Sequence, residues 1–157
     1  MTAETLTWRQ WIDIPPVWLG GFIALAWVQA QVLPLGLSLK GGVTDLLGGA
    51  LIGGGLILAT LAIYEMRRQR TTFVPHQQAA ALVQSGIFSR SRNPIYLGDL
   101  LILAGLILRF DAILSLVLLP IFLWVIERRF VIPEEDRLRR KFRADFARYC
   151  QKTRRWL

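Results

Sequence analysis

The stretch Leu46–Tyr64, LLGGALIGGGLILATLAIY, contains no charged residue and decides the fold class of this chain. A helix needs roughly 20 apolar residues to cross the hydrocarbon core of a bilayer, which is about 30 Å thick. The whole chain of 157 residues is 54% hydrophobic, and its mean hydropathy is +0.41. This composition is too apolar for an ordinary soluble domain, so we expect an all-α integral membrane protein.

Three further apolar runs predict three more transmembrane helices. They are Pro15–Leu35, Ile95–Leu108 with Asp99 inside it, and Ala112–Ile132, which ends in charged residues. Long basic side chains at such an end can reach the headgroup region. Only residues 109–111 separate the last two runs, so we expect a tight antiparallel hairpin there. The sequence thus predicts four spans in a single membrane domain, residues 1–157.

The distribution of basic residues predicts the orientation of these spans. Lys40 and Arg109 lie in the connections after the first and third spans, and the other 17 of the 19 basic residues lie in the N-terminus, the 65–94 loop and the C-terminal tail. The positive-inside rule places those three segments, and therefore both termini, in the cytoplasm. A basic face with a net charge of +8 on a membrane protein suits anionic lipid headgroups, so we expect no nucleic-acid partner.

Two kinds of chemistry are excluded by residue counts. The chain has one cysteine, Cys150, and one histidine, His76. A single cysteine cannot form an internal disulfide, and one cysteine with one histidine does not make a zinc site. We expect no metal.

Residues 1–66 are expected to be structural. The second span contains two small-xxx-small pairs, Gly49 with Gly53 and Ala50 with Gly54. Such pairs let helices approach closely in lipid, so they predict helix packing or a homodimer through this span.

Residues 72–157 contain the groups that suit chemistry. The segment Ser91–Gly98, SRNPIYLG, crowds arginine, amide, proline, tyrosine and glycine where a basic loop meets an apolar helix. Glu134 and Glu135 follow the fourth run, and either start the next helix or contribute to a site. Apolar residues spaced i, i+4, i+8 and i+11 then predict an amphipathic C-terminal helix: Leu138, Phe142, Phe146 and Tyr149.

This half of the chain resembles the isoprenylcysteine carboxyl methyltransferase and phospholipid methyltransferase family. The shared pattern is Leu-Val-x-x-Gly-x-Phe-x-x-x-Arg-Asn-Pro-x-Tyr-x-Gly, a helical hairpin, Glu-Glu-x-x-Leu-x-x-x-Phe and then Tyr. In this sequence it comprises Leu82, Val83, Gly86, Phe88, Arg92, Asn93, Pro94, Tyr96, Gly98, Glu134, Glu135, Leu138, Phe142 and Tyr149.

The resemblance implies an integral membrane methyltransferase that uses S-adenosylmethionine and acts on a lipophilic acceptor from the cytoplasmic face. Arg92 suits the cofactor carboxylate, and Glu134 and Glu135 suit its ammonium and ribose hydroxyls. The backbone at Gly86 can approach a ligand closely because it has no side chain. The remaining cofactor-binding residues are expected to be Leu82, Val83, Phe88, Asn93, Pro94, Tyr96 and Gly98.

The predicted catalytic residues are Arg92, Asn93, Tyr96, Glu135 and Arg129. Arg129 is expected either to bind an acceptor carboxylate or to reach the membrane interface. The family's usual histidine before the proline is Asn93 here, and asparagine cannot take up a proton near neutral pH. The sequence therefore predicts that Asn93 binds the cofactor and does not act as a general base.

Two alternatives remain open on the sequence. Gly98-Asp99 resembles a Gly-Glu pair of the sterol reductase group, which favours an NADPH-dependent membrane reductase. A non-enzymatic membrane scaffold is the other alternative. Asp99 lies in an apolar helix, where a carboxylate usually faces the protein interior, and neither it nor His76 has an assigned role.

Overall fold

The computed structural model describes residues 13–33, 38–71 and 80–157, and within these ranges the chain is helical with no strand. An all-α fold is thus confirmed for the described residues. The longer helices are α2 (Pro15–Val32), α3 (Gly42–Arg68), α4 (Pro94–Phe110), α5 (Leu118–Ile126) and α6 (Ile132–Lys152). Shorter helical turns are η1 (Gly86–Ser89), η2 (Ile113–Val117) and the π-helical turn η3 (Glu127–Val131).

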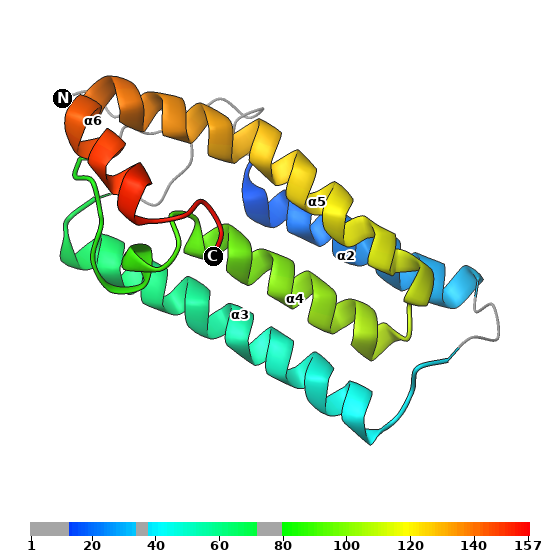
Figure 1. Cartoon of the computed structure of the whole chain (residues 1–157). Helices are drawn as coiled ribbons and strands as arrows, with labels where there is room; N and C mark the ends of the chain where they lie inside the picture. Colours follow the sequence, from blue (N-terminus) through cyan, green and yellow to red (C-terminus); the bar gives the residue numbers. More distant parts are fainter. Residues whose placement is uncertain (1–12, 34–37, 72–79) are drawn as a thin grey trace.

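Helix α4 is the centre of the bundle, with α3 on one side and α2 and α5 on the other (Figure 1). Between α2, α4 and α5 lies an apolar core in which the rings of Phe22 and Phe122 meet edge to face at 5.2 Å. Leu103 and Ile107 of α4 are fully buried in the same core. The central position of α4 fixes the place of the polar segment that leads into it.

Glycine contacts hold α3 against α4. A Cβ atom on Gly55 would lie 2.5 Å from the carbonyl oxygen of Gly98, and one on Gly105 would lie 2.6 Å from that of Gly48. Real Cβ atoms are not found at such distances, so these backbones approach as closely as they do because both sides lack side chains. The two contacts are seven residues apart on each helix, two turns, so one face of each helix carries both.

The glycines that pack α3 on α4 are not those of the predicted small-xxx-small pairs. Among the described residues, no atom lies within 4 Å of a Cβ built on Gly49, Gly53 or Gly54, because α4 packs on the adjacent face of α3. A homodimer through these residues stays a prediction.

The tight hairpin after the third run is confirmed. Helix α4 ends at Phe110, and Asp111 takes a left-handed conformation (φ 58°) as its C-cap. The amide of Ala112 then donates to the carbonyl of Ile107 at 3.0 Å, which closes the helix end.

The fourth run and the C-terminal helix form one continuous helical path and not two separate elements (Figure 1). Pro133 has no N–H and its ring displaces the carbonyl four residues before it. The π-helical turn Glu127–Val131 ends two residues before this proline and widens the helix, so the chain continues without a break.

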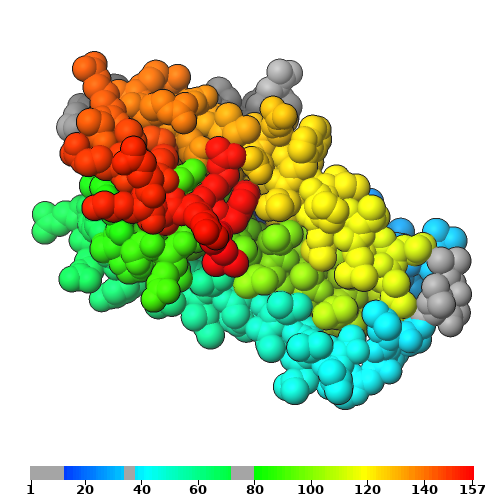
Figure 2. Space-filling model, viewed as in Figure 1, coloured from blue at the N-terminus to red at the C-terminus, as the bar shows by residue number. Residues whose placement is uncertain are grey.

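The real bend lies later, at Arg143, whose φ of 41° and ψ of −110° are not helical. The predicted apolar stripe is therefore split. Phe146 and Tyr149, which follow the bend, are buried, whereas Leu138 and Phe142 precede it and are half-buried. After the bend the chain turns back, so that its last residues lie on the segment leading into α4 (Figure 2).

Among the described residues, one helix, α3, is both long and apolar enough to cross a membrane. Helices α2 and α4, with 18 and 17 residues, are shorter than α3. The outer faces of the bundle nonetheless expose many large apolar side chains, including Leu25, Trp27, Leu46, Leu56, Ile57, Ile121 and Trp124. Four spans with both termini in the cytoplasm stay a prediction.

Candidate active site

The two halves of the predicted motif meet at the start of α4. Arg92 donates to Oε1 of Glu135 from Nη2 at 2.9 Å and from Nε at 3.3 Å. Its Nη1 atom donates to the carbonyls of Thr153 at 2.7 Å and Cys150 at 3.4 Å. This guanidinium therefore ties the entry of α4 to both ends of the C-terminal helix α6.

A second arginine, which sequence reasoning missed, binds the same carboxylate. Arg155 donates to Glu135 from Nη2 to Oε2 at 2.7 Å and from Nε to Oε1 at 3.2 Å. Its Nη1 atom donates to Glu127. In the sequence Arg155 is one of many basic residues in the tail, and nothing in its spacing marks it out. Only the bend at Arg143 brings it back to Glu135.

The charge of Glu135 is well compensated. Burial opposes ionisation of this carboxyl, but the hydrogen bonds and positive charges of Arg155 and Arg92 outweigh it and lower the pKa of Glu135 below 4.5. The same pairing raises the pKa of Arg155 above its ordinary value. Glu135 is thus an anion at neutral pH although its residue is only 6% exposed.

Glu134 lies in a different environment from its neighbour. Its Oε2 atom accepts a hydrogen bond from the hydroxyl of buried Tyr96 at 3.2 Å. Burial raises the pKa of the Glu134 carboxyl, against the lowering effects of the Tyr96 hydrogen bond and the charge of Arg137. Asp99 lies about one turn after Tyr96 on α4. It is also buried, and it is close enough to Tyr96 for an electrostatic interaction with the tyrosine hydroxyl. The two adjacent glutamates thus have opposite tendencies to ionise.

Asn93, at the family's histidine position, holds the end of the chain. Its side-chain Nδ2 donates to the carbonyl of Arg155 at 3.1 Å, and its backbone N–H donates to Ser91 Oγ at 3.2 Å. The backbone N–H of Arg92 donates to the carbonyl of Arg154 at 3.1 Å. We name residues 153–157 the tail segment. These bonds fix it beside the start of α4.

The loop before α4 packs on the C-terminal end of α3. Val83 and Phe88 are buried and lie in a small apolar cluster with Ala62. The carbonyl of Phe88 accepts a 2.6 Å hydrogen bond from the hydroxyl of Tyr149, which joins this loop to α6. Leu82 is half-buried. The predicted role of Leu82, Val83 and Phe88 as walls for an adenine stays a prediction.

Gly86 is required by the backbone of this loop. Its φ is +59°, and a Cβ on it would lie 2.9 Å from Oε2 of Glu65. Glu65, a buried carboxylate that sequence reasoning missed, also accepts hydrogen bonds from Ser85 and Gln69. In the structure Gly86 therefore makes room for Glu65, and its role in cofactor binding stays a prediction.

Three other predicted residues have clear positions. Pro94 is buried in the first turn of α4, which it starts. Gly98 lies against Gly55 and serves helix packing. Arg129 pairs with Asp13, with Nε 2.6 Å from Oδ1, and lies over the ring of Trp18 at 5.0 Å. An acceptor contact of Arg129 stays a prediction.

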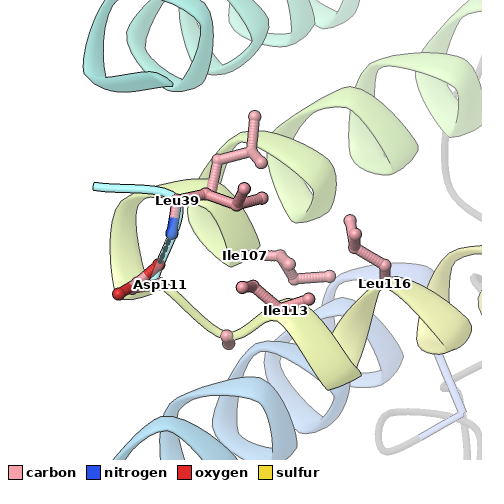
Figure 3. Close-up of a pocket in the computed structure, with 7 residues that line it drawn as sticks. Leu39, Ile107, Asp111, Ile113 and Leu116 are labelled. Atoms are coloured by element: carbon pink, nitrogen blue, oxygen red, sulfur yellow. Dashed lines mark hydrogen bonds between the residues drawn. The ribbon is translucent and has the colours of Figure 1, made fainter. Parts of the chain in front are cut away.

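A hollow lined by six apolar residues and Asp111 lies at the opposite end of α4 (Figure 3). It includes Leu39, whose backbone N–H donates to Asp111 at 2.8 Å. Because a 17-residue helix is about 25 Å long, this hollow is remote from Arg92 and is not part of the candidate site. His76 lies outside the described residues, and the described residues contain no cluster that could hold a metal ion.

The geometry defines a helical protein with a charged site where α4, α6 and the tail segment meet. A family model described as phospholipid methyltransferase matches residues 43–145, well over half of the chain. The chain therefore belongs to the phospholipid methyltransferase family, and the predicted resemblance is confirmed. Membership implies a membrane methyltransferase. The match contains Arg92 and Glu135 but not Arg155. Comparisons with curated proteins and with solved structures give no match.

Proposed function

We propose that this chain transfers a methyl group from S-adenosylmethionine to a lipophilic acceptor held in the membrane. The observation that carries the proposal is the contact between Arg92 and Glu135, which joins the two separated parts of the family motif at 2.9 Å. A single place thus offers a cation for the cofactor carboxylate and a carboxylate for its ammonium group. The family match supports methyl transfer as the reaction.

The surrounding residues fit the rest of this ligand. The second carboxyl group, Glu134, is bound to the Tyr96 hydroxyl and is suited to a ribose hydroxyl. Apolar and aromatic side chains at Val83, Phe88 and Tyr96 are suited to an adenine ring. No metal ligand is needed for any of these contacts.

The bound cofactor supplies a methyl group that is already activated by a positively charged sulfur. The protein's contribution is therefore positioning and the exclusion of water. Arg92 and Glu135 orient the amino-acid end of the cofactor, and the buried face of α4 around Tyr96 shields the site from water. Asn93 cannot take up a proton near neutral pH, and its amide serves to position the tail segment.

We further propose that the site faces the cytoplasm of an inner or plasma membrane and that the acceptor enters from the bilayer. The basic residues of α6 and the tail segment support this orientation through the positive-inside rule. The exposed apolar side chains of α2, α3 and α5 support contact with lipid. Isoprenylcysteine-type carboxylates and phospholipid amines are both suitable acceptors.

Binding measurements test this proposal. Isothermal titration of the detergent-solubilised chain with S-adenosylmethionine, S-adenosylhomocysteine and NADPH should show binding of the first two and not of NADPH. Arg92→Ala and Glu135→Ala should abolish this binding. Arg90→Ala and Asp136→Ala are matched controls, because Arg90 is exposed and Asp136 pairs with an exposed arginine. Binding of NADPH alone would favour the reductase, and wild-type affinity in both site variants would refute the site.

The acceptor requires a separate assay. Transfer of radiolabelled methyl groups to membrane extracts and to a panel of lipophilic acids, amines and thiols should label one class. Incorporation that is lost in Arg92→Ala and kept in Arg90→Ala would identify the acceptor. Cofactor binding without transfer to any acceptor would count against the enzyme.

A further inference from the structure

The carboxylate of Glu135 already binds two cations in this structure. Its Oε1 atom accepts three hydrogen bonds, two from Arg92 and one from Arg155, and its Oε2 atom accepts one, from Arg155. A carboxylate oxygen offers about two lone-pair sites, so Oε1 has none left and Oε2 has one. A ligand ammonium on Oε2 would add a third positive charge beside one buried carboxylate, so it competes with the two guanidinium groups for Glu135.

Arg155 is the arginine that can withdraw. The Arg92 side chain is 13% exposed and is also bound to the carbonyls of Thr153 and Cys150. The Arg155 side chain is 34% exposed and already donates to a second carboxylate, that of Glu127. When Arg155 leaves Glu135 its charge stays paired, whereas Arg92 has no other carboxylate bound to it among the described residues.

We propose that Arg155 is a further residue of the cofactor site and that it exchanges with the ligand. In the free protein its guanidinium occupies Glu135; when a ligand ammonium binds Glu135, Arg155 remains on Glu127 alone. This inference rests on the proposed function, because it takes the ligand to carry an amino-acid group. Glu135 exchanges one cation for another, so its negative charge is compensated in both states.

The exchange gives Arg155 and Glu127 opposite effects on affinity. Removal of Arg155 frees Glu135 in advance, so ligands with an ammonium group should bind more tightly. Removal of the charge of Glu127 takes away the carboxylate that binds Arg155 after the exchange. Arg155 then stays on Glu135, so the same ligands should bind more weakly. A network that only stabilised the fold would weaken binding in both variants.

The experiment measures the affinity of S-adenosylhomocysteine by isothermal titration in detergent. We expect Arg155→Ala to bind about three- to tenfold more tightly than the wild type and Glu127→Gln about three- to tenfold more weakly. In the double variant the effect of Glu127→Gln should vanish, because Arg155 is no longer there to retreat. Arg154→Ala, at an exposed neighbouring arginine, should change the affinity less than twofold.

A second ligand isolates the amino-acid group. Methylthioadenosine has no ammonium group, so Arg155→Ala should leave its affinity unchanged. Arg155→Gln is the second variant if the alanine variant does not fold, and the same increase is expected of it. Weaker binding of S-adenosylhomocysteine to these variants, with wild-type binding intact, overturns the exchange alone. Absence of binding to the wild type and to Arg155→Ala overturns the proposed function and the exchange together.

Discussion

The guanidinium of Arg92 donates two hydrogen bonds to one oxygen of Glu135, a residue 43 positions further along the chain. The arginine precedes the first turn of α4, and the glutamate lies in the first turn of α6. The pair therefore fixes the start of the central helix to the helix that covers it. Every part of the candidate site is arranged around this contact.

Replacing Arg92 should lower the stability of the protein through the loss of both its charge and its hydrogen-bond geometry. Arg92→Lys keeps the positive charge but not the planar fork that reaches Glu135 and two carbonyls at once. We expect Arg92→Ala to lower the free energy of unfolding by about 2–3 kcal/mol, because Glu135 keeps Arg155, with a smaller loss for Arg92→Lys. Thermal unfolding in detergent measures both. Arg90→Ala should be unchanged, and equal stability of Arg92→Ala and Arg90→Ala would contradict the role of the pair.

The two adjacent glutamates should respond to pH with opposite signs. The pKa of Glu135 is lowered, so its contribution to stability is present above about pH 4.5, its ordinary pKa, and is lost as the pH falls through the lowered value. The pKa of Glu134 is raised, so its contribution is present below pH 4.5 and is lost as the pH rises through the raised value.

Melting temperatures measured from pH 7 to pH 3 test this difference. The deficit of Glu135→Gln relative to the wild type should shrink on acidification. The wild type should gain stability relative to Glu134→Gln over the same change. Parallel pH profiles for the two variants would show that the glutamates do not differ in environment.

The contact between α3 and α4 should not tolerate a methyl group. In Gly55→Ala the added Cβ would lie 2.5 Å from the carbonyl of Gly98, so the helices must separate, at a cost of about 1–3 kcal/mol. Gly49→Ala is the matched control, because no atom of the described residues lies within 4 Å of its Cβ position and alanine favours the helix by up to about 1 kcal/mol. Thermal unfolding should rank Gly49→Ala at or above the wild type and Gly55→Ala below it. The reverse order would show that a different face packs.

The hydroxyl of Tyr149 should stabilise the junction between α6 and the loop before α4. Tyr149→Phe leaves the carbonyl of buried Phe88 without the donor that the structure gives it, at a cost of about 1–3 kcal/mol. Tyr64→Phe removes a hydroxyl from a residue that is 64% exposed and should cost almost nothing. Urea titration followed by tryptophan fluorescence measures the two variants. Equal midpoints would mean that the bond does not contribute.

Local patterns predicted much of the fold. The uncharged run at Leu46–Tyr64 lies within α3. The hairpin was expected at residues 109–111, and the chain turns at Asp111 and Ala112, directly after α4. Pro94 begins α4, because its fixed φ and missing N–H favour the first position of a helix. The motif also predicted that Arg92 and Glu135 belong to one site, and their side chains contact each other in the structure.

Other features could not be predicted from local patterns. Gly48 and Gly55 pack on α4 while Gly49 and Gly53 do not, because the rotation of a helix about its axis is set by its neighbours. Helices α5 and α6 are continuous through a π-helical turn, and no single residue predicts that turn. The contact of Arg155 with Glu135, and that of Glu65 with the loop before α4, join segments that are distant in the sequence, so no local pattern predicted them.

The sequence by itself determined the helical class, the apolar segments and the residue types of the charged site, since each follows from composition or from short-range spacing. Only the tertiary structure decided which of those groups bind one another. The backbone at Arg143 leaves the helical conformation, the chain turns back, and Arg155 reaches the carboxylate that Arg92 already holds. A hydrogen bond acts over about 3 Å, and no pattern along the chain specifies a distance between residues that far apart in sequence.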